Sequence, residues 1–118
     1  LESVVIQDSV TFIDEHAFYE CHSLSSLTLP DSVVYIGRLA FSGCTGLKSV
    51  ALPCSVALIC DWAFQNCNSL TSITIPRSVT YVGEGAFSEC SKLKTASVPE
   101  GLVCQKSVFP EYTAVSRY

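Results

Sequence analysis

Apolar residues recur along this chain in one pattern that repeats every 23 residues with little drift. Each copy begins with a leucine, continues with alternating apolar and small polar residues, and then carries an Ala-Phe pair followed by a cysteine. The leucines are Leu1, Leu24, Leu47, Leu70 and Leu93, and the cysteines are Cys21, Cys44, Cys67 and Cys90. A fixed period of this length predicts a solenoid, in which one supersecondary unit stacks along an axis.

The first part of each copy predicts a short β-strand. Its fourth and sixth positions are apolar and alternate with small polar residues, the period of two expected when one face of a strand is buried. The inward residues are expected to be Val4 and Ile6, Leu27 and Leu29, Val50 and Leu52, and Ile73 and Ile75. A proline then ends the strand, because it cannot donate to a ladder. Each strand is expected to pair in parallel with its counterpart in the next copy.

The second part of each copy predicts a turn packed against the core. The spacing of Ala, Phe and Cys fits a short helical or 3₁₀ turn, and the expected inward aromatic rings are Phe18, Phe41, Phe64 and Phe87. A glycine at the fourteenth position, Gly37 or Gly83, predicts a corner with a positive φ. The four cysteines are expected to form a stacked, reduced core column rather than a disulfide framework or a zinc site.

The copies define the expected organisation of the chain. Residues 1–99 are predicted to form coils 1–23, 24–46, 47–69 and 70–92 and the start of a fifth coil at 93. Residues 100–118 are a degenerate fifth repeat, in which Val108-Phe109 replaces Ala-Phe and the cysteine is missing, and they predict a C-terminal cap or a frayed tail. The first copy shows no such degeneration, so a further coil upstream is expected.

The motif resembles one particular class of leucine-rich repeat. The residues that carry the likeness in the fourth copy are 72–79 (SITIPRSV), Val82-Gly83, Ala86-Phe87 and Cys90. They are similar to the consensus of the BspA-like (Treponema pallidum-type) family. The resemblance implies a curved solenoid with a parallel β-sheet on the concave face and short strands and helical or 3₁₀ turns on the convex side. It also implies a role in surface adhesion or protein binding, an extracellular or cell-surface location, and no shared catalytic residues.

Composition and charge exclude several classes of function. Hydrophobic residues make up 48% of the chain and charged residues 15%, which excludes a disordered segment. The net charge of −4, with scattered Lys and Arg, argues against a nucleic-acid partner. No apolar run approaches the ~18 residues needed to span a membrane. The polar residues form ladders rather than one convergent cluster, so we predict no enzyme activity, no cofactor and no catalytic or metal site.

Two outward stripes are candidate binding surfaces. The first is the solvent face of the strands, which is rich in hydroxyl groups and nearly uncharged. Its residues are Ser3, Ser26, Thr28, Ser49, Ser72, Thr74 and Thr95. These small residues either keep a solvated sheet soluble, or form a surface on which an extended partner lies through many weak hydrogen bonds.

The second stripe is the twelfth position of each copy, where apolar and aromatic residues are unexpected on an outward-facing position. Its residues are Phe12, Tyr35, Leu58 and Tyr81, and Trp62 could extend it. An exposed ladder of this kind would mark a contact surface. The alternative is that a local bulge lets these side chains lie flat over the edge of the coil.

The leading hypothesis from the sequence is a non-enzymatic binding module, a fragment of a larger surface protein that presents a face to a protein or glycan partner. The alternative is a structural module that self-associates end to end, because an uncapped coil offers an open strand edge.

Overall fold

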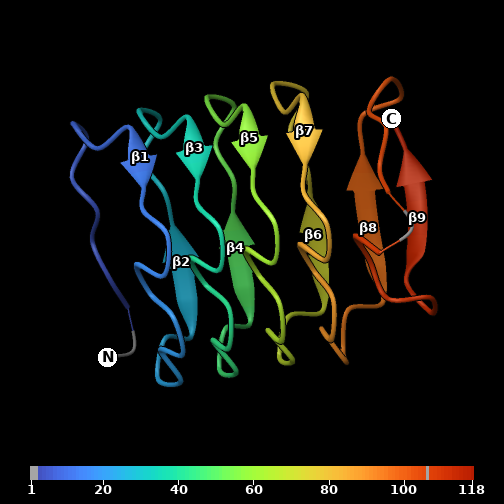
Figure 1. The fold of residues 1–118 in the computed structure, drawn as a ribbon, viewed down its shortest axis with the longest axis horizontal. Coiled ribbons are helices and arrows are strands. Elements are labelled where there is room, and N and C mark those ends of the chain that lie inside the picture. Colours follow the sequence, from blue (N-terminus) through green and yellow to red (C-terminus); the bar gives the residue numbers. More distant parts are fainter. Residues whose placement is uncertain (1–2, 106) are drawn as a thin grey trace.

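Short strands build the fold, a stack of coils in which successive strands lie side by side (Figure 1), and the second, third and fourth coils contribute two strands each. The structure, a computed structural model, describes residues 3–105 and 107–118, so the leucine predicted to open the first coil lies outside the described residues. The longer strands are β2 (Ser26–Thr28), β4 (Ser49–Ala51), β6 (Ser72–Thr74), β8 (Thr95–Val98) and β9 (Ala114–Arg117). The shorter strands are β1 (Phe12–Ile13), β3 (Tyr35–Ile36), β5 (Leu58–Ile59) and β7 (Tyr81–Val82).

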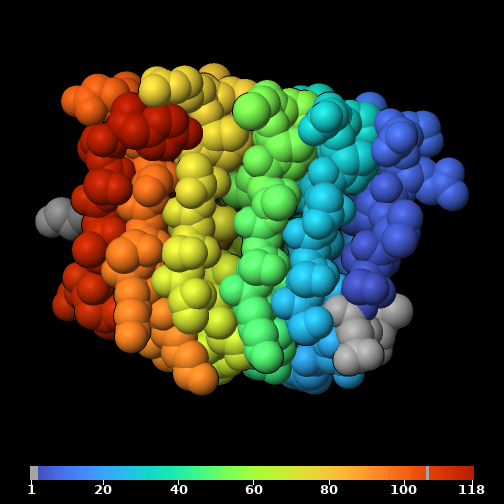
Figure 2. Space-filling model, turned by 180° about the vertical axis from the view of Figure 1, so that it is seen from behind, coloured from blue at the N-terminus to red at the C-terminus, as the bar shows by residue number. Residues whose placement is uncertain are grey.

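All strand pairs are parallel, as the repeat predicts. The shorter strands form one four-stranded sheet in the order β1-β3-β5-β7, which we call the short-strand sheet. Its register follows the repeat, since Phe12 pairs with Tyr35 and Leu58 with Tyr81. The longer strands form two separate sheets, β2-β4 and β6-β8-β9. We call their outward surface, which Figure 2 views from outside, the long-strand face.

The core is a set of columns, each made of one repeat position. Four successive pairs of phenylalanine rings stack nearly parallel from Phe18 to Phe109, with centroids 5.1–5.4 Å apart. Phe41, Phe64 and Phe87 are fully buried, so the predicted inward column is confirmed. Because one coil cannot enclose such a ring by itself, the stacking of neighbours supplies its environment.

The cysteine column is confirmed, and the structure gives it a second role. The thiols are free, and Cys44, Cys67 and Cys90 are fully buried, whereas Cys21 in the first coil is half-buried. Each buried thiol donates a hydrogen bond to a phenylalanine carbonyl of the preceding coil; that of Cys67, for example, reaches the Phe41 carbonyl at 3.3 Å. Cysteine therefore acts here as a small core residue that also satisfies a buried acceptor.

A serine column crosses between coils in the same way. The hydroxyls of Ser32, Ser55 and Ser78 each donate to a valine carbonyl of the preceding coil, at 2.6 Å in all three cases. These serines explain the recurrent Ser-Val pair of the repeat, because the hydroxyl satisfies a backbone acceptor that no strand reaches.

The turn after the short strand differs from the prediction. The segment is a run of turns, and the described residues contain no helix, hence none that could cross a membrane. In the second coil Leu39 and Gly43 have φ values of 58° and 79°. Residues in this left-handed conformation interrupt a helical turn. As a result, successive backbone amides bond alternately within their own coil and to the neighbouring coil. Accordingly, the Ala40 amide bonds within its own coil, at 3.1 Å, whereas the Phe41 amide bonds to the next coil, at 2.7 Å.

The prediction for Gly37 and Gly83 was wrong. Neither residue has a positive φ. They are required because the backbone of the preceding coil approaches too closely for a side chain. A Cβ at Gly37 would lie 2.7 Å from the Ile13 carbonyl oxygen, and one at Gly83 would lie 2.7 Å from the Cys60 carbonyl carbon. Close approach of two backbones, rather than an unusual dihedral, favours glycine in these two coils, whereas the third coil carries Cys60 at the same repeat position.

Residues 100–118 continue the stack. Leu102 and Val108 are buried, and β9 adds a parallel strand beside β8. The Tyr112 hydroxyl donates to the Cys90 carbonyl, and the Thr113 hydroxyl to the Leu93 carbonyl, both at 2.8 Å. This segment therefore covers the apolar interior of the last coil and satisfies carbonyl groups there.

Candidate binding surfaces

The hydroxyl-bearing residues predicted on the strands do lie on the long-strand face. β2 and β6 alternate between exposed polar and buried apolar side chains, the pattern of a half-buried strand. The exposed members are Ser26, Thr28, Ser49, Ser72, Thr74 and Thr95, and Ser3 is exposed in the first coil. Consecutive coils run side by side across this face (Figure 2).

The long-strand face is interrupted between the third and fourth coils. β4 pairs with β2, and β6 pairs with β8, but no ladder joins β4 to β6 within the described residues. The same two coils remain joined in the short-strand sheet, where β5 pairs with β7. The third and fourth coils are therefore joined by strand pairing in the short-strand sheet, which we call the closed side of the junction. They lack strand pairing on the long-strand face, which we call its open side.

This separation reaches the core. Leu27 and Leu29 in the second coil and Ile73 in the fourth are 2–4% exposed. Val50 and Leu52, which occupy the same repeat positions in the third coil, are only half-buried. The sequence predicts all of these side chains to be inward, so the difference arises from the missing strand pair and not from the repeat.

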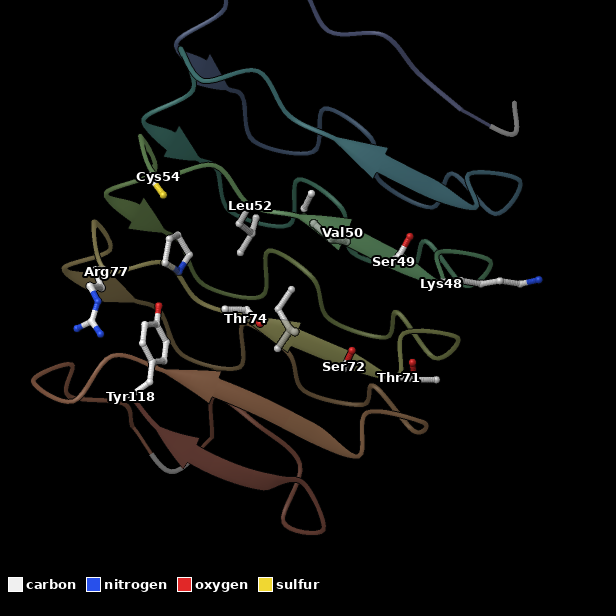
Figure 3. Close-up of a pocket in the computed structure, with 13 residues that line it drawn as sticks. Lys48, Ser49, Val50, Leu52, Cys54, Thr71, Ser72, Thr74, Arg77 and Tyr118 are labelled. Carbon is white, nitrogen blue, oxygen red and sulfur yellow. The ribbon is translucent and has the colours of Figure 1, made fainter.

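A groove of about 600 Å³ follows the separation (Figure 3). Its lining includes the half-buried Val50 and Leu52, the hydroxyls of Ser49, Ser72 and Thr74, and the exposed thiol Cys54. Lys48 lies near one end of the labelled group and Arg77 near the other (Figure 3). Lys48 and Arg77 are the charged side chains among the lining residues, and both are cationic.

The end of the groove near Arg77 is built with a residue from the C-terminal segment. The Arg77 guanidinium lies 4.6 Å from the centre of the Tyr118 ring, within the range of a cation–π contact. The Tyr118 hydroxyl donates to the Ile75 carbonyl, which ties residue 118 back to the fourth coil. Tyr118 therefore fixes the position of the guanidinium.

The aromatic stripe predicted at the twelfth position forms the outward side of the short-strand sheet. Phe12 is 50% and Tyr81 44% exposed, while Tyr35 and Leu58 are half-buried. The rings of Phe12 and Tyr35 stack with centroids 4.4 Å apart. Trp62 lies in the following turn, where the Arg38 guanidinium stands 5.2 Å from its ring centre.

A small depression lies beside this stripe, lined by Tyr35, Cys60, Asp61 and Tyr81 among others. A hydrogen bond with Cys60 raises the pKa of Tyr35. The charge of Asp61, whose carboxylate accepts a hydrogen bond from the Tyr81 hydroxyl at 3.4 Å, raises the pKa of Tyr81. Both phenols are therefore neutral donors at physiological pH.

Sequence reasoning missed the groove. Its hydroxyl residues were identified, but Lys48, Arg77 and Tyr118 were not, because nothing in a 23-residue repeat indicates that one strand pair is absent.

Comparison with known proteins agrees with the repeat architecture. The family model for the BspA type leucine rich repeat region matches residues 1–114 in six copies. No curated protein matches the chain significantly. Among solved structures, a leucine-rich repeat protein from Bacteroides ovatus is 36% identical, with a TM-score of 0.87 over 92% of this chain and 28% of that one.

Two further structures are similar. A leucine rich cell surface protein from Faecalibacterium prausnitzii is 32% identical, with a TM-score of 0.89 over 98% of this chain and 31% of that one. The Treponema pallidum leucine rich repeat protein is 30% identical, with a TM-score of 0.63 over 81% of this chain and 58% of that one. The chain thus spans less than a third of the Bacteroides and Faecalibacterium proteins. The match over residues 1–114 shows that this chain belongs to the BspA-type leucine-rich repeat family.

Proposed function

We propose that this chain is a non-enzymatic binding module that holds a protein or glycan partner on its long-strand face. One observation carries the proposal: the long strands of successive coils present exposed, uncharged hydroxyl groups on one face. These groups belong to Ser26, Thr28, Ser49, Ser72, Thr74 and Thr95. A preformed row of donors and acceptors offers an extended partner many weak hydrogen bonds while losing little side-chain entropy on binding.

The family and one relative support a role at the cell surface. Leucine-rich repeats generally serve protein interactions, and extended solenoid surfaces suit that task. The relative from F. prausnitzii is described as a cell surface protein. By this likeness we place the module in a larger surface-exposed protein, where partner binding would serve adhesion.

The experiment is a binding screen with two variants that separate the two candidate surfaces. The chain is tetramerised on streptavidin and applied to a peptide-display library and to a glycan array. Ser49→Arg with Thr74→Arg places two bulky charges on the long-strand face without touching the core. Tyr35→Ser with Tyr81→Ser removes two rings from the aromatic stripe. Circular dichroism and urea unfolding check that both variants are folded.

The proposal predicts that the arginine variant loses at least about tenfold in affinity for whatever the wild type binds, because a bulky charge blocks the face. The tyrosine variant should bind like the wild type. Loss of binding only in the tyrosine variant would move the site to the aromatic stripe. Absence of binding to both collections would contradict the proposal.

A second candidate function, end-to-end self-association, rests on the two ends of the stack. All four side chains of β9 are exposed, and β9 pairs only with β8 among the described residues. Val5 is 90% exposed in the first coil. Open strand edges can pair with another copy. Residues 100–118 instead favour a cap, since Thr113 and Tyr112 satisfy carbonyl groups there. A mass that rises with concentration in analytical ultracentrifugation supports self-association, and a constant monomer mass excludes it.

A further inference from the structure

We propose that the groove on the long-strand face binds a short acidic oligosaccharide whose carboxylate is held by Arg77; the inference rests on the proposed function of that face. It names the class of partner and the part of the face that receives it. The ligand lies over the strands and contacts their outward side chains. It does not enter the sheet, because Cα atoms of β4 and β6 come within 8 Å of one another, whereas an inserted strand would need about 9.5 Å.

Arg77 is a cation that is held in place and left without a counter-charge. Its guanidinium lies 4.6 Å from the centre of the Tyr118 ring, and the Tyr118 hydroxyl is tied to the Ile75 carbonyl. The ion pairs among the described residues both involve Glu15, and neither includes Arg77. A guanidinium fork matches the two oxygens of a carboxylate. Because the ring already positions the fork, little side-chain entropy is lost when a carboxylate binds.

Arg38 shows the same ring contact with the charge already satisfied. Its guanidinium stands 5.2 Å from the centre of the Trp62 ring, and one of its nitrogens lies 3.6 Å from a carboxylate oxygen of Glu15. The two arginines therefore share an aromatic neighbour and differ in the counter-charge. Of the two, Arg77 is the one whose charge is left for a ligand.

The rest of the groove offers hydroxyl groups beside an apolar floor. The hydroxyls of Ser49, Ser72 and Thr74 can each donate and accept a hydrogen bond, and the half-buried Val50 and Leu52 supply aliphatic surface. A sugar ring has C–H groups on its faces and hydroxyls around its rim, so it can cover the floor and bond to the hydroxyl side chains at once. The volume of about 600 Å³ lies within the range of about 300–1,000 Å³ that is usual for small-molecule sites.

The second cation indicates more than one acidic group on the ligand. Lys48 precedes β4 and Arg77 follows β6, and the two side chains stand near opposite ends of the labelled group (Figure 3). No carboxylate is found among the described residues that line the groove, although the chain carries a net charge of −4. An oligosaccharide of uronic acids, with a carboxylate on each ring, complements both ends.

An acidic peptide matches these observations less well. The polar contacts of the groove come from outward side chains, and β4 and β6 stand too close together for a further strand between them. A peptide laid over the face would leave its own N–H and C=O groups to water and would lose backbone freedom on binding. The oligosaccharide is therefore the occupant that the groove favours.

The test is an NMR titration of the isotope-labelled chain with trigalacturonic acid, a trisaccharide of uronic acids. Binding should shift the signal of the Arg77 Nε–H group and the amide signals of Ser72 and Thr74. The matched control ligand is the methyl ester of the same trisaccharide, which keeps the rings and hydroxyls and removes the charges. A capped triglutamate peptide keeps the charges and removes the rings. Both should bind at least about tenfold more weakly than the trisaccharide acid.

Matched variants test the guanidinium. Arg77→Gln should weaken binding of trigalacturonic acid at least about tenfold, because the charged fork is lost. Arg77→Lys should weaken it at least about threefold, because an ammonium keeps the charge but cannot form the bidentate contact. Arg38→Gln is the control, since it makes the same change in charge at a guanidinium that already pairs with Glu15. It should leave the affinity within about twofold.

The exposed thiol of Cys54 gives a second readout, because it also lines the groove. Saturating trigalacturonic acid should slow alkylation of Cys54 by iodoacetamide at least about threefold, since the bound ligand covers the thiol. An unchanged rate at saturation would place the ligand outside the groove and overturn the proposal.

Three further results would overturn it: equal binding of the methyl ester, equal or tighter binding of triglutamate, or wild-type affinity in Arg77→Gln. The proposed function is separable from this outcome. If the screen partner is lost with Ser49→Arg and Thr74→Arg, but neither trigalacturonic acid nor any acidic glycan of the array binds, the groove proposal fails and the long-strand face remains the binding surface.

Discussion

The third and fourth coils meet on two sides that differ in how they are held. On the closed side β5 pairs with β7, the rings of Phe64 and Phe87 stack 5.3 Å apart, and the Cys90 thiol donates to the Phe64 carbonyl at 3.2 Å. On the open side β4 and β6 form no ladder within the described residues, and a groove lies between them. One junction thus combines a fully buried core contact on one side with an accessible groove on the other.

The contrast indicates that the packed interior of a solenoid, more than its outer strand pairing, keeps successive coils in register. Burying a phenylalanine side chain contributes about 1.5–3 kcal/mol, whereas a typical hydrogen bond contributes a net ~1 kcal/mol. The stacked columns can therefore hold two coils in register after a few strand bonds are lost. The long-strand side can therefore open at one junction while the stack stays in register.

The largest effect should follow from damage to the closed side. Phe64→Ala removes the central ring of the column and should lower the free energy of unfolding by about 3–5 kcal/mol, as buried phenylalanine truncations do. The matched control is Phe12→Ala, because that ring is half-exposed and, among the described residues, stacks on Tyr35 alone. It should cost about 1 kcal/mol. Urea unfolding measures both, and equal costs would show that the column does not hold the coils.

A smaller loss of stability should follow when a side chain is placed between the two backbones that meet on the closed side. Gly83→Ala places a Cβ against the backbone of Cys60 and Asp61 and should destabilise by about 1–3 kcal/mol, the usual cost of overpacking. Gly101→Ala is the control, since its Cβ would meet nothing within 4 Å. Its effect should stay within about 1 kcal/mol. Thermal unfolding of the two variants measures both effects. An unchanged melting temperature in Gly83→Ala would contradict the close-approach explanation.

The two sides should also differ in thiol chemistry without any mutation. Cys54 is exposed in the groove, while Cys67 is fully buried. The neighbouring thiol of Cys90 and burial raise the pKa of Cys67 above its ordinary value. Native protein treated with iodoacetamide should be alkylated at Cys54 and not at Cys67, as read by mass spectrometry of peptides. Rapid labelling of Cys67, or a disulfide between Cys44 and Cys67, would contradict the core column.

The same thiols predict a pH dependence. Burial raises the pKa of Cys44 from 9.0 to about 11. Between these values the unfolded thiol ionises while the folded thiol stays protonated, so the unfolded state binds fewer protons. The free energy of unfolding should fall as the pH rises from 9 to 11, and Cys44→Ala should reduce that slope. An unchanged slope in the variant would show that Cys44 is not desolvated.

Much of this architecture could be predicted from the sequence because packing repeats with the chain. The Phe and Cys columns follow from spacing alone, since only buried positions need the same residue in every coil. The turn and glycine predictions failed for a shared reason. Gly37 and Gly83 respond to a backbone in the preceding coil, and Leu39 takes a left-handed conformation that its residue type does not favour. In both cases contacts between coils, which the sequence of a single repeat does not reveal, determine the local backbone structure.

The candidate site was predictable only in part. Ser49, Ser72 and Thr74 were placed on an outward face because alternation along a strand fixes direction. The open junction has no signature in the sequence, because Val50 and Leu52 fit the repeat motif as well as the equivalent residues of coils whose long strands are paired. Tyr118 reaches Ile75 across 43 positions of sequence, a contact that no repeat position specifies.

The most direct test of an open junction is amide hydrogen exchange of the free chain, followed residue by residue by NMR. The Ile75 and Lys94 amides donate to carbonyls of neighbouring coils, whereas the amides of the groove-lining Leu52 and Thr71 donate no such bond within the described residues. At equal intrinsic rates, Leu52 and Thr71 should exchange at least about tenfold faster than Ile75 and Lys94. Equal protection of all four amides would contradict the account, because it would mean that β4 and β6 are joined by a ladder like the other long strands.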